Sequence, residues 1–166
     1  MRLNISDIVK QSGASLDIKF SENLLGLNEL FEDITFDGPV NFEGKLLNVS
    51  GILKLRGQIS ASYHTKCFRC LQNLKEEMSF EIQEDILDAR SSTDSEAYTF
   101  EGYHFEIDKV IMDYIVINLP MRHECGSECK GLCLKCGNNL NTSSCVCSKE
   151  DTINPQMEAL RDFFNS

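Results

Sequence analysis

Six of the eight cysteines of this chain lie between residues 125 and 147, in the segment CGSECKGLCLKCGNNLNTSSCVC. Cysteines at this density can form disulfides, hold a structural metal ion, act as a redox switch or supply a catalytic thiolate. The compartment separates these alternatives, because extracellular clusters usually form disulfides whereas cytosolic clusters usually bind metal or react with oxidants. The N-terminal sequence MRLNISDIVKQSGASLDIKF lacks the apolar core of a signal peptide, and no later segment resembles a membrane span. We therefore expect a cytoplasmic protein whose cysteines are metal ligands.

The spacing of the last four cysteines is typical of a structural zinc site. Cys133 and Cys136 form a Cys-x-x-Cys pair, and Cys145 and Cys147 complete a set of four within fifteen residues. Two thiolates separated by two residues can bind one tetrahedral zinc ion from a tight turn, and Gly137 supplies the backbone freedom that such a turn uses. The sequence therefore predicts a first site for Zn²⁺ at Cys133, Cys136, Cys145 and Cys147.

The other four cysteines allow two interpretations. Cys67 and Cys70 follow a predicted strand, whereas Cys125 and Cys129 begin the cysteine-rich segment. Together the four could form a second site for Zn²⁺ that ties the strand to this segment. Alternatively Cys67 and Cys70 are spare thiols, because two ligands alone do not make a site. His123, close to Cys125, could replace one thiolate, although a solvated loop histidine is the simpler interpretation.

Alternating apolar and polar residues predict the elements that position these cysteines. One long strand, or two joined near Gly57, is expected from Val49 to Tyr63, and further strands are expected over residues 40–46 and 78–86. Consecutive strands with short connections favour an antiparallel meander, whose apolar face needs a cover.

Two helices could supply this cover. One is expected to begin at Asp108 as its N-cap, to end before Pro120 and to be buried on more than one face, including Val116; the other covers residues 154–164. The predicted fold class is α+β, an antiparallel β-meander covered by one or two helices, with a zinc-stapled cysteine-rich C-terminal module. The expected parts are a β-rich α+β core domain (1–120), a cysteine-rich zinc module (121–150) and a C-terminal helix (151–166).

The formal net charge of -10 is concentrated in one stretch. The stretch from Glu76 to Asp108 contains eleven acidic residues and a single basic one, Arg90. Such a stretch repels phosphate and attracts basic partners, unless it is only a solvated surface. Direct RNA binding has weaker support, because the module lacks aromatic residues and carries few bases. The candidate RNA-contacting bases are Lys66, Arg69, Lys130 and Lys135.

Three segments in order, CFRCL, INLPMRHECGSECKGLCLKCGNNLN and NPQMEALRDFF, resemble the YceD family of bacterial ribosomal-RNA accumulation proteins. The resemblance runs from about residue 40 to the C-terminus and is most specific in CKGLCLKCGNNLN. It implies an α+β domain that acts in the accumulation of large-subunit ribosomal RNA. Because family genes commonly stand beside the gene of a small zinc-ribbon ribosomal protein, it also implies a ribosomal protein or a large-subunit precursor as partner. No catalytic residue comes with the resemblance.

Enzymatic motifs are missing from the sequence. The three histidines, His64, His104 and His123, do not form a metallohydrolase motif, and there is no Gly-rich phosphate loop or nucleophile elbow. We therefore expect a protein that is not an enzyme, with no small-molecule substrate. Two alternatives stay open: a redox-regulated chaperone, in which oxidation releases zinc and exposes a client surface, and a zinc protein that binds RNA directly.

Overall fold

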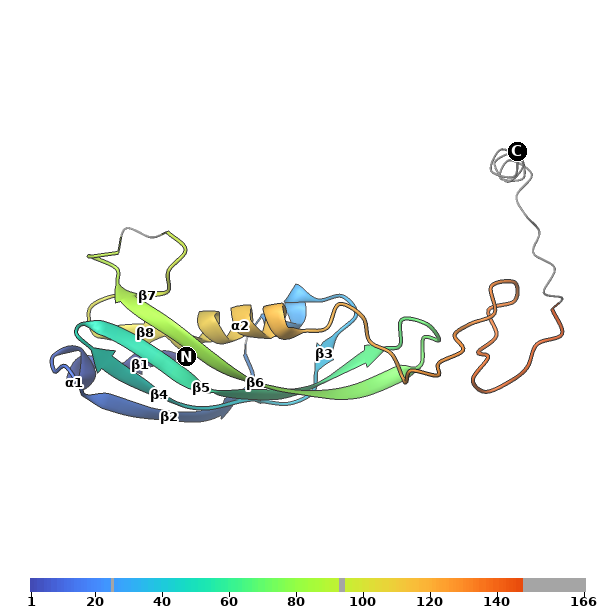
Figure 1. Ribbon diagram of the computed structural model, residues 1–166, viewed down its shortest axis with the longest axis horizontal. Helices are drawn as coiled ribbons and strands as arrows, with labels where there is room; N and C mark the ends of the chain where they lie inside the picture. Colours follow the sequence, from blue (N-terminus) through green and yellow to red (C-terminus); the bar gives the residue numbers. More distant parts are fainter. Residues whose placement is uncertain (25, 93–94, 148–166) are drawn as a thin grey trace, which may run out of the picture.

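The computed structural model describes residues 1–24, 26–92 and 95–147, and a long twisted sheet runs through most of it (Figure 1). The strands of this sheet lie in the order β2 (Ser15–Glu22), β4 (Val40–Val49), β5 (Ile52–Lys66), β6 (Asn73–Asp88) and β7 (Thr99–Phe100). A short strand, β3 (Thr35–Phe36), pairs with β5 next to the end of β4. All these pairings are antiparallel except that of β6 with β7. The predicted antiparallel meander is therefore confirmed.

The remaining elements cover the sheet or close its ends. Helix α2 (Ile107–Asn118) lies along one face of the sheet, as Figure 1 shows. The strands β1 (Arg2–Asn4) and β8 (His104–Glu106) form a separate pair, and α1 (Ser6–Val9) and the 3-10 helix η1 (Leu27–Leu30) are short. The helix expected over residues 154–164 lies outside the described residues. In the described part of the chain, no helix is long and apolar enough to span a membrane.

The predicted long strand begins later than expected, because a hairpin turn precedes it. Ser50 and Gly51 both have positive φ, 55° and 92°, and connect β4 to β5 in a two-residue turn. Val49 pairs with Ile52, so core-facing positions are even-numbered in β4 and odd-numbered in β5. Val49 therefore lies on the opposite face from Leu53, although the apolar alternation continues through the turn.

Helix α2 also differs from its prediction in two respects. Its N-cap is Glu106, and Asp108 lies in the first helical turn, where a negative charge complements the helix dipole. The face that contacts the sheet contains Val110, Ile111 and Ile115, all buried, whereas Val116 is 44% exposed. The helix is therefore buried on one side rather than on several.

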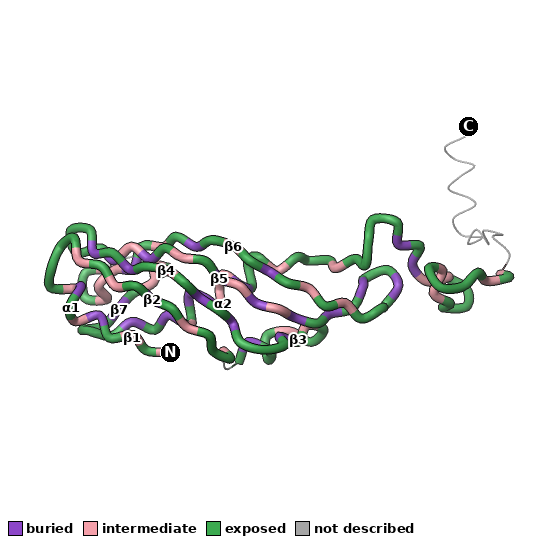
Figure 2. Tube along the Cα trace, turned by 90° about the horizontal axis from the view of Figure 1, so that it is seen from below, coloured by how far each residue is buried: buried purple, intermediate pink, exposed green. Residues whose placement is uncertain are grey.

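The hydrophobic core lies between α2 and the sheet. Figure 2 shows buried positions alternating with exposed ones along the strands, as a sheet with one covered face requires. A polar anchor closes one end of this core, because the buried side chain of Asn48 donates to the carbonyl of Ile8 at 2.6 Å and accepts from the N–H of Gly51 at 2.9 Å. The other face of the sheet carries charged residues and cross-strand ion pairs such as Lys54–Asp85 at 2.8 Å.

Two glycines make room for an aromatic ring in the middle of the sheet. Gly44 of β4 pairs with Gly57 of β5, and the buried ring of Phe42 lies across them. A Cβ atom at Gly57 would stand 2.6 Å from two ring carbons of Phe42 and 2.7 Å from the carbonyl oxygen of Glu43. Because a backbone atom is among these neighbours, a side chain at this position cannot be accommodated by ring rotation alone. β5 runs through Gly57 without a break, since Gly57 pairs with Gly44 on one side and with Ile82 on the other. Of the two sequence alternatives, the single long strand is therefore the one found.

We expect Gly57→Ala to destabilise the sheet by about 1–3 kcal/mol, the usual cost of overpacking a core. Urea unfolding followed by circular dichroism measures this loss. Gly126→Ala is the matched control, because nothing lies within 4 Å of a Cβ atom there and its φ is not positive. Equal stability of the two variants would contradict the packing of Phe42 against the glycine pair.

Candidate metal centre

Four of the cysteines meet at the end of the β5–β6 hairpin. Cys67 and Cys70 lie in the turn that joins the two strands. Cys125 and Cys129 belong to the segment that continues from α2 past this turn (Figure 1). Their sulfur atoms all lie within 4.8 Å of one another, with Cys67 and Cys129 at 3.9 Å and Cys70 and Cys125 at 3.7 Å. We call these four residues the hairpin cluster.

The other four cysteines form a second group in the chain that follows. The sulfur atoms of Cys133, Cys136, Cys145 and Cys147 also lie within 4.8 Å of one another. We call these residues the loop cluster. Cys133 and Cys136 come from one tight turn, and Cys145 and Cys147 fold back towards it. The structure thus brings together the four cysteines that the spacing grouped, and also the four for which the sequence left a second site and spare thiols as alternatives. All eight cysteines are free thiols rather than disulfides.

The geometry of both clusters fits a metal ion bound by four sulfurs. Zinc–sulfur bonds of about 2.3 Å in a tetrahedron place the sulfurs about 3.8 Å apart. Two sulfur–sulfur distances of the hairpin cluster, Cys70–Cys125 at 3.7 Å and Cys67–Cys129 at 3.9 Å, are close to this value. Either cluster could therefore hold one thiophilic metal ion.

The two Cys-x-x-Cys turns share one backbone hydrogen-bond pattern. In the first, the N–H of Cys67 donates to the carbonyl of Gln72 at 2.8 Å, and the N–H of Leu71 donates to the carbonyl of Cys67 at 2.9 Å. In the second, Cys133 donates to Asn138 and Gly137 donates to Cys133, both at 2.8 Å. The residue after each second cysteine has positive φ, 59° at Leu71 and 72° at Gly137. The hairpin and the loop therefore present the same ligand-bearing turn twice.

Backbone hydrogen bonds on both sides of the hairpin cluster join the two parts of the chain. The N–H of Phe68 donates to the carbonyl of His123 at 2.8 Å, and the N–H of Leu132 donates to the carbonyl of Arg69 at 3.0 Å. The segment after α2 is thus hydrogen-bonded to the hairpin turn at His123, which precedes its two cysteines in sequence, and at Leu132, which follows them.

Asn141 connects the two clusters, and sequence reasoning did not identify it. Its side-chain amide donates to the sulfur of Cys129 at 3.5 Å, and its side-chain oxygen accepts from the N–H of Lys130 at 2.7 Å. Leu140 donates its N–H to the carbonyl of Gly131 at 2.9 Å. The sequence signal for this role was the motif GNNLN, whose last asparagine lies between the cysteines of the loop cluster. In the fold, its side chain contacts the hairpin cluster instead.

The backbone favours ionised sulfur at one position in each cluster. At Cys133, the N–H groups of Cys136 and Lys135 lower the pKa of the thiol to about 6. At Cys67, burial raises the pKa, but several backbone N–H groups, first that of Cys125, lower it to a net value of about 6. Hydrogen bonds to a thiolate stabilise its charge, so these two sulfurs are ready metal ligands.

Other thiols in the same clusters resist ionisation. The neighbouring sulfur of Cys129 is the main cause that raises the pKa of Cys125 to about 12, and that of Cys136 raises the pKa of Cys147 to about 12. Four thiolates this close together repel one another, and a central cation removes this repulsion. The chemistry of the donor set therefore favours a metal ion in each cluster.

The surroundings of the hairpin cluster differ from the sequence interpretation in two respects: the environment of His123, and the presence of an aromatic residue, Phe68, beside the module. The ring of His123 packs edge-on against Tyr63, with centroids 5.5 Å apart, so it is neither a ligand nor a solvated loop residue. The ring of Phe68 is 62% exposed, and the guanidinium of Arg122 stacks on it at 5.1 Å. The module lacks an aromatic residue of its own, but the fold places one from the hairpin beside its bases.

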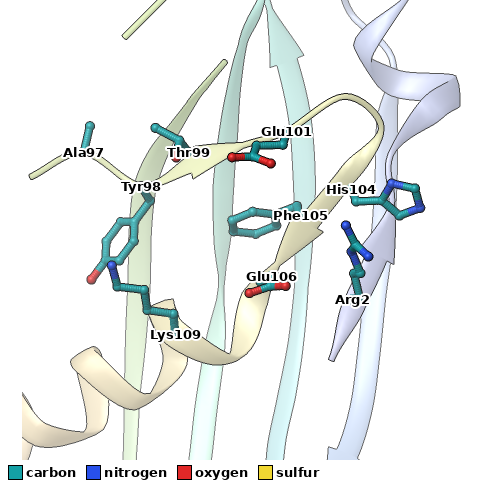
Figure 3. Close-up of a pocket in the computed structure, with 9 residues that line it drawn as sticks. All are labelled: Arg2, Ala97, Tyr98, Thr99, Glu101, His104, Phe105, Glu106 and Lys109. Carbon is teal, nitrogen blue, oxygen red and sulfur yellow. The ribbon is translucent and has the colours of Figure 1, made fainter. Parts of the chain in front are cut away.

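A polar hollow lies elsewhere in the molecule, between β1, β8 and the strand β7 (Figure 3). Its volume is about 330 Å³, and its lining includes Arg2, Glu101, His104 and Lys109. No cysteine lines it, so the hollow is separate from both clusters. Its mixture of charges does not single out one ligand.

The fold and the clusters define a class of protein: a β-meander with one covering helix that carries two four-cysteine metal-binding candidates at one end. The family described as large ribosomal RNA subunit accumulation protein YceD matches residues 55–164, which is more than half of the chain and includes all eight cysteines. The chain belongs to this YceD family. The family's description names a role in ribosomal RNA accumulation and no enzymatic reaction.

The similar curated proteins include one bacterial and two plant sequences. An uncharacterised protein of Mycobacterium leprae is 26% identical over 113 residues, which are 64% of this chain and 52% of that protein. The chloroplastic proteins named large ribosomal RNA subunit accumulation protein YCED homolog 1 of Arabidopsis thaliana and Zea mays are 44% and 51% identical over 51 and 43 residues. These matches cover 31% and 25% of this chain, but only 16% and 15% of the plant proteins. The chain thus spans about half of the bacterial relative and much less of the plant ones, and no solved structure matches it significantly.

We expect Asn141→Ala to lower the affinity of the hairpin cluster for Co²⁺ about tenfold, because hydrogen bonds to ligand atoms support metal binding. Titration with Co²⁺, followed by thiolate charge-transfer absorption, measures this affinity. Asn138→Ala is the control, since Asn138 contributes its backbone carbonyl to the second turn and its side chain makes no hydrogen bond recorded among the described residues. An unchanged titration for Asn141→Ala would show that the amide–sulfur contact has no role in the site.

Proposed function

We propose that this chain is a non-enzymatic, cytoplasmic bacterial factor that supports the accumulation of large-subunit ribosomal RNA by binding a ribosomal protein or a precursor particle. The family match over residues 55–164 carries this proposal, because it covers the sheet hairpin and both clusters together. The matched stretch of this chain thus contains most of the β5–β6 hairpin and the cysteine-rich end, and the sequence shows no catalytic motif.

Each cluster, in this proposal, holds one Zn²⁺ ion in a structural role. Zinc prefers tetrahedral thiolate ligands, and four-cysteine sites are structural rather than catalytic because no coordination position stays open. The hairpin cluster (Cys67, Cys70, Cys125 and Cys129) would tie the segment after α2 to the sheet. The loop cluster (Cys133, Cys136, Cys145 and Cys147) would give the exposed loop a fixed shape that its few buried side chains do not supply.

A division into a core domain of residues 1–120, a module of residues 121–150 and a terminal helix of residues 151–166 remains part of the proposal. The hairpin cluster takes two ligands from each side of the first boundary. The core and the module would therefore be coupled by metal while the core keeps its own apolar packing between α2 and the sheet.

RNA contact is the second candidate function, and the position of Phe68 supports it. An exposed aromatic ring beside arginine side chains can stack on an unpaired nucleobase, while nearby lysine and arginine side chains contact phosphate. Phe68 and Arg122 provide this combination, and Arg69 and Lys130 are exposed close to the same cluster. Crosslinking of the intact chain to ribosomal RNA in cells, mapped to the peptide that contains Phe68, is the experiment that supports or removes this candidate.

We expect freshly purified, reduced protein to contain about two equivalents of zinc, one for each four-sulfur set. Cys136→Ser should lose the ion of the loop cluster and keep the other, and proteolysis should then cut after residue 132 and spare β5 and β6. Cys129→Ser should lose the ion of the hairpin cluster. Metal analysis of the three proteins decides between these outcomes, and less than half an equivalent in the wild-type protein would exclude the structural role of zinc.

Deletion of the gene for this chain should lower the ratio of mature large-subunit to small-subunit ribosomal RNA in its own host. Wild-type protein should restore the ratio, whereas the Cys129→Ser variant should not, because its cysteine-rich end is detached from the sheet. Quantitative RNA analysis measures this ratio. The redox-chaperone alternative predicts the opposite dependence on zinc: peroxide treatment that releases zinc would switch on suppression of client aggregation.

A further inference from the structure

Among the described residues, the outer edge of β6 has no strand partner over most of its length. β6 pairs with β5 without interruption from residue 73 to residue 86, and on its other side it pairs with β7 only at Leu87 and Asp88. Figure 1 shows β7 beside one end of β6 and no strand beyond the rest of it. Long free edges are uncommon in sheets, because their backbone groups invite pairing with another chain.

The direction of the free backbone groups follows from the pairing with β7. Leu87 and Ala89 donate their N–H groups outward, at 2.9 and 3.1 Å. Because these groups alternate along a strand, the odd-numbered residues from 75 to 85 point theirs away from β5 as well. Within the described residues, only the carbonyl of Gln83 among them has a partner, the hydroxyl of Tyr114 at 3.2 Å. A run of outward N–H and C=O groups from residue 75 to residue 81 is therefore free to pair.

From residue 76 to residue 81 the charged side chains of this run are all acidic, whereas Lys75 at its start is paired with Asp37 at 3.7 Å. Glu77 and Glu81 lie on the uncovered face of the sheet and are exposed, and Glu76 lies on the helix side. None of these three carboxylates forms an ion pair within the described part of the chain. Phe80, on the helix side, is half-buried and offers an apolar contact at the edge.

This combination selects one kind of occupant. A second copy of β6 would place its own glutamates beside Glu77 and Glu81, and like charges in opposing positions are destabilising. RNA phosphates would meet the same repulsion. An extended polypeptide with a base at every second position would place its cations opposite these glutamates and its other side chains towards Phe80.

We propose that the free edge of β6 binds an extended, lysine- or arginine-rich polypeptide segment as an added strand. The backbone supplies the hydrogen bonds of such a strand, and the glutamates supply its selectivity for basic sequences. This inference rests on the proposed function and names the chemical class of its protein partner. It also gives the acidic residues of β6 a role, since they exclude copies of the same chain and phosphate while admitting a basic segment.

A short peptide of alternating lysine and valine, added to the full chain, tests this proposal. Binding should protect the backbone amides of Glu77, Ser79 and Glu81 from hydrogen exchange, whereas the even-numbered amides, already bonded to β5, should change little. Peptide N-methylated on the edge that faces β6 should not bind, and peptide N-methylated on its other edge should bind as before.

Two protein variants separate edge pairing from general attraction. Glu77→Gln with Glu81→Gln should weaken peptide binding about three- to tenfold, the value of one or two cross-strand charge pairs. Asp17→Asn with Glu43→Gln removes the same charge from the same face of the sheet on β2 and β4, and should leave binding within about twofold, because screening limits distant charges.

Three results would overturn the proposal: equal binding of the two N-methylated peptides, no amide protection at residues 77–81, or protection of these amides in the free chain through self-association. A short single-stranded RNA that protects the same amides would assign the edge to a different partner. Failure here is distinct from failure of the proposed function. If the Glu77→Gln, Glu81→Gln protein restores ribosomal RNA accumulation while Cys129→Ser does not, the function stands and the edge is not its binding site.

Discussion

The convergence of four sulfurs at the hairpin cluster is the constraint on which the cysteine-rich end depends. Cys67, Cys70 and Cys129 are almost fully buried there, and in the described part of the chain two partly buried hydrophobic residues, Leu74 and Leu132, pack around them. This small group is separate from the main core under α2, and two aliphatic side chains bury too little apolar surface to hold a chain segment in place. Whatever fixes these sulfurs also fixes the position of residues 123–132 against the hairpin turn.

The sheet determines where this convergence can occur. β5 and β6 are 15 and 16 residues long, and together they carry the Cys67 turn well beyond the end of α2 (Figure 1). The continuous strand through Gly57, with Phe42 across the glycine pair, keeps the hairpin a single rigid element. A break at Gly57 would separate the ligand-bearing turn from the part of the sheet that α2 covers.

Much of this arrangement could be predicted from local patterns, and the failures have physical causes. Apolar alternation predicted the meander, but it could not locate the turn at Ser50 because a two-residue hairpin reverses the parity of buried positions. Spacing grouped the loop cluster directly. The hairpin cluster stayed open because Cys67 and Cys129 are 62 residues apart in sequence, and only the tertiary fold brings them together. The contacts of Asn141 and Phe68 could not be predicted for the same reason: each acts on residues from another part of the chain.

The two clusters close loops of very different length. The loop cluster draws its ligands from residues 133–147, whereas the contact of Cys70 with Cys125 spans 55 residues that include β6 and α2. The entropy lost on closing a loop rises slowly with its length, so the longer closure costs only about 1 kcal/mol more. The larger difference is in what each cluster needs: the loop cluster draws on one short segment, whereas the hairpin cluster draws on two segments separated by β6 and α2. The position of its four sulfurs therefore depends on how β6 and α2 are placed, so the geometry of the hairpin cluster reports on the tertiary fold in a way that the geometry of the loop cluster does not.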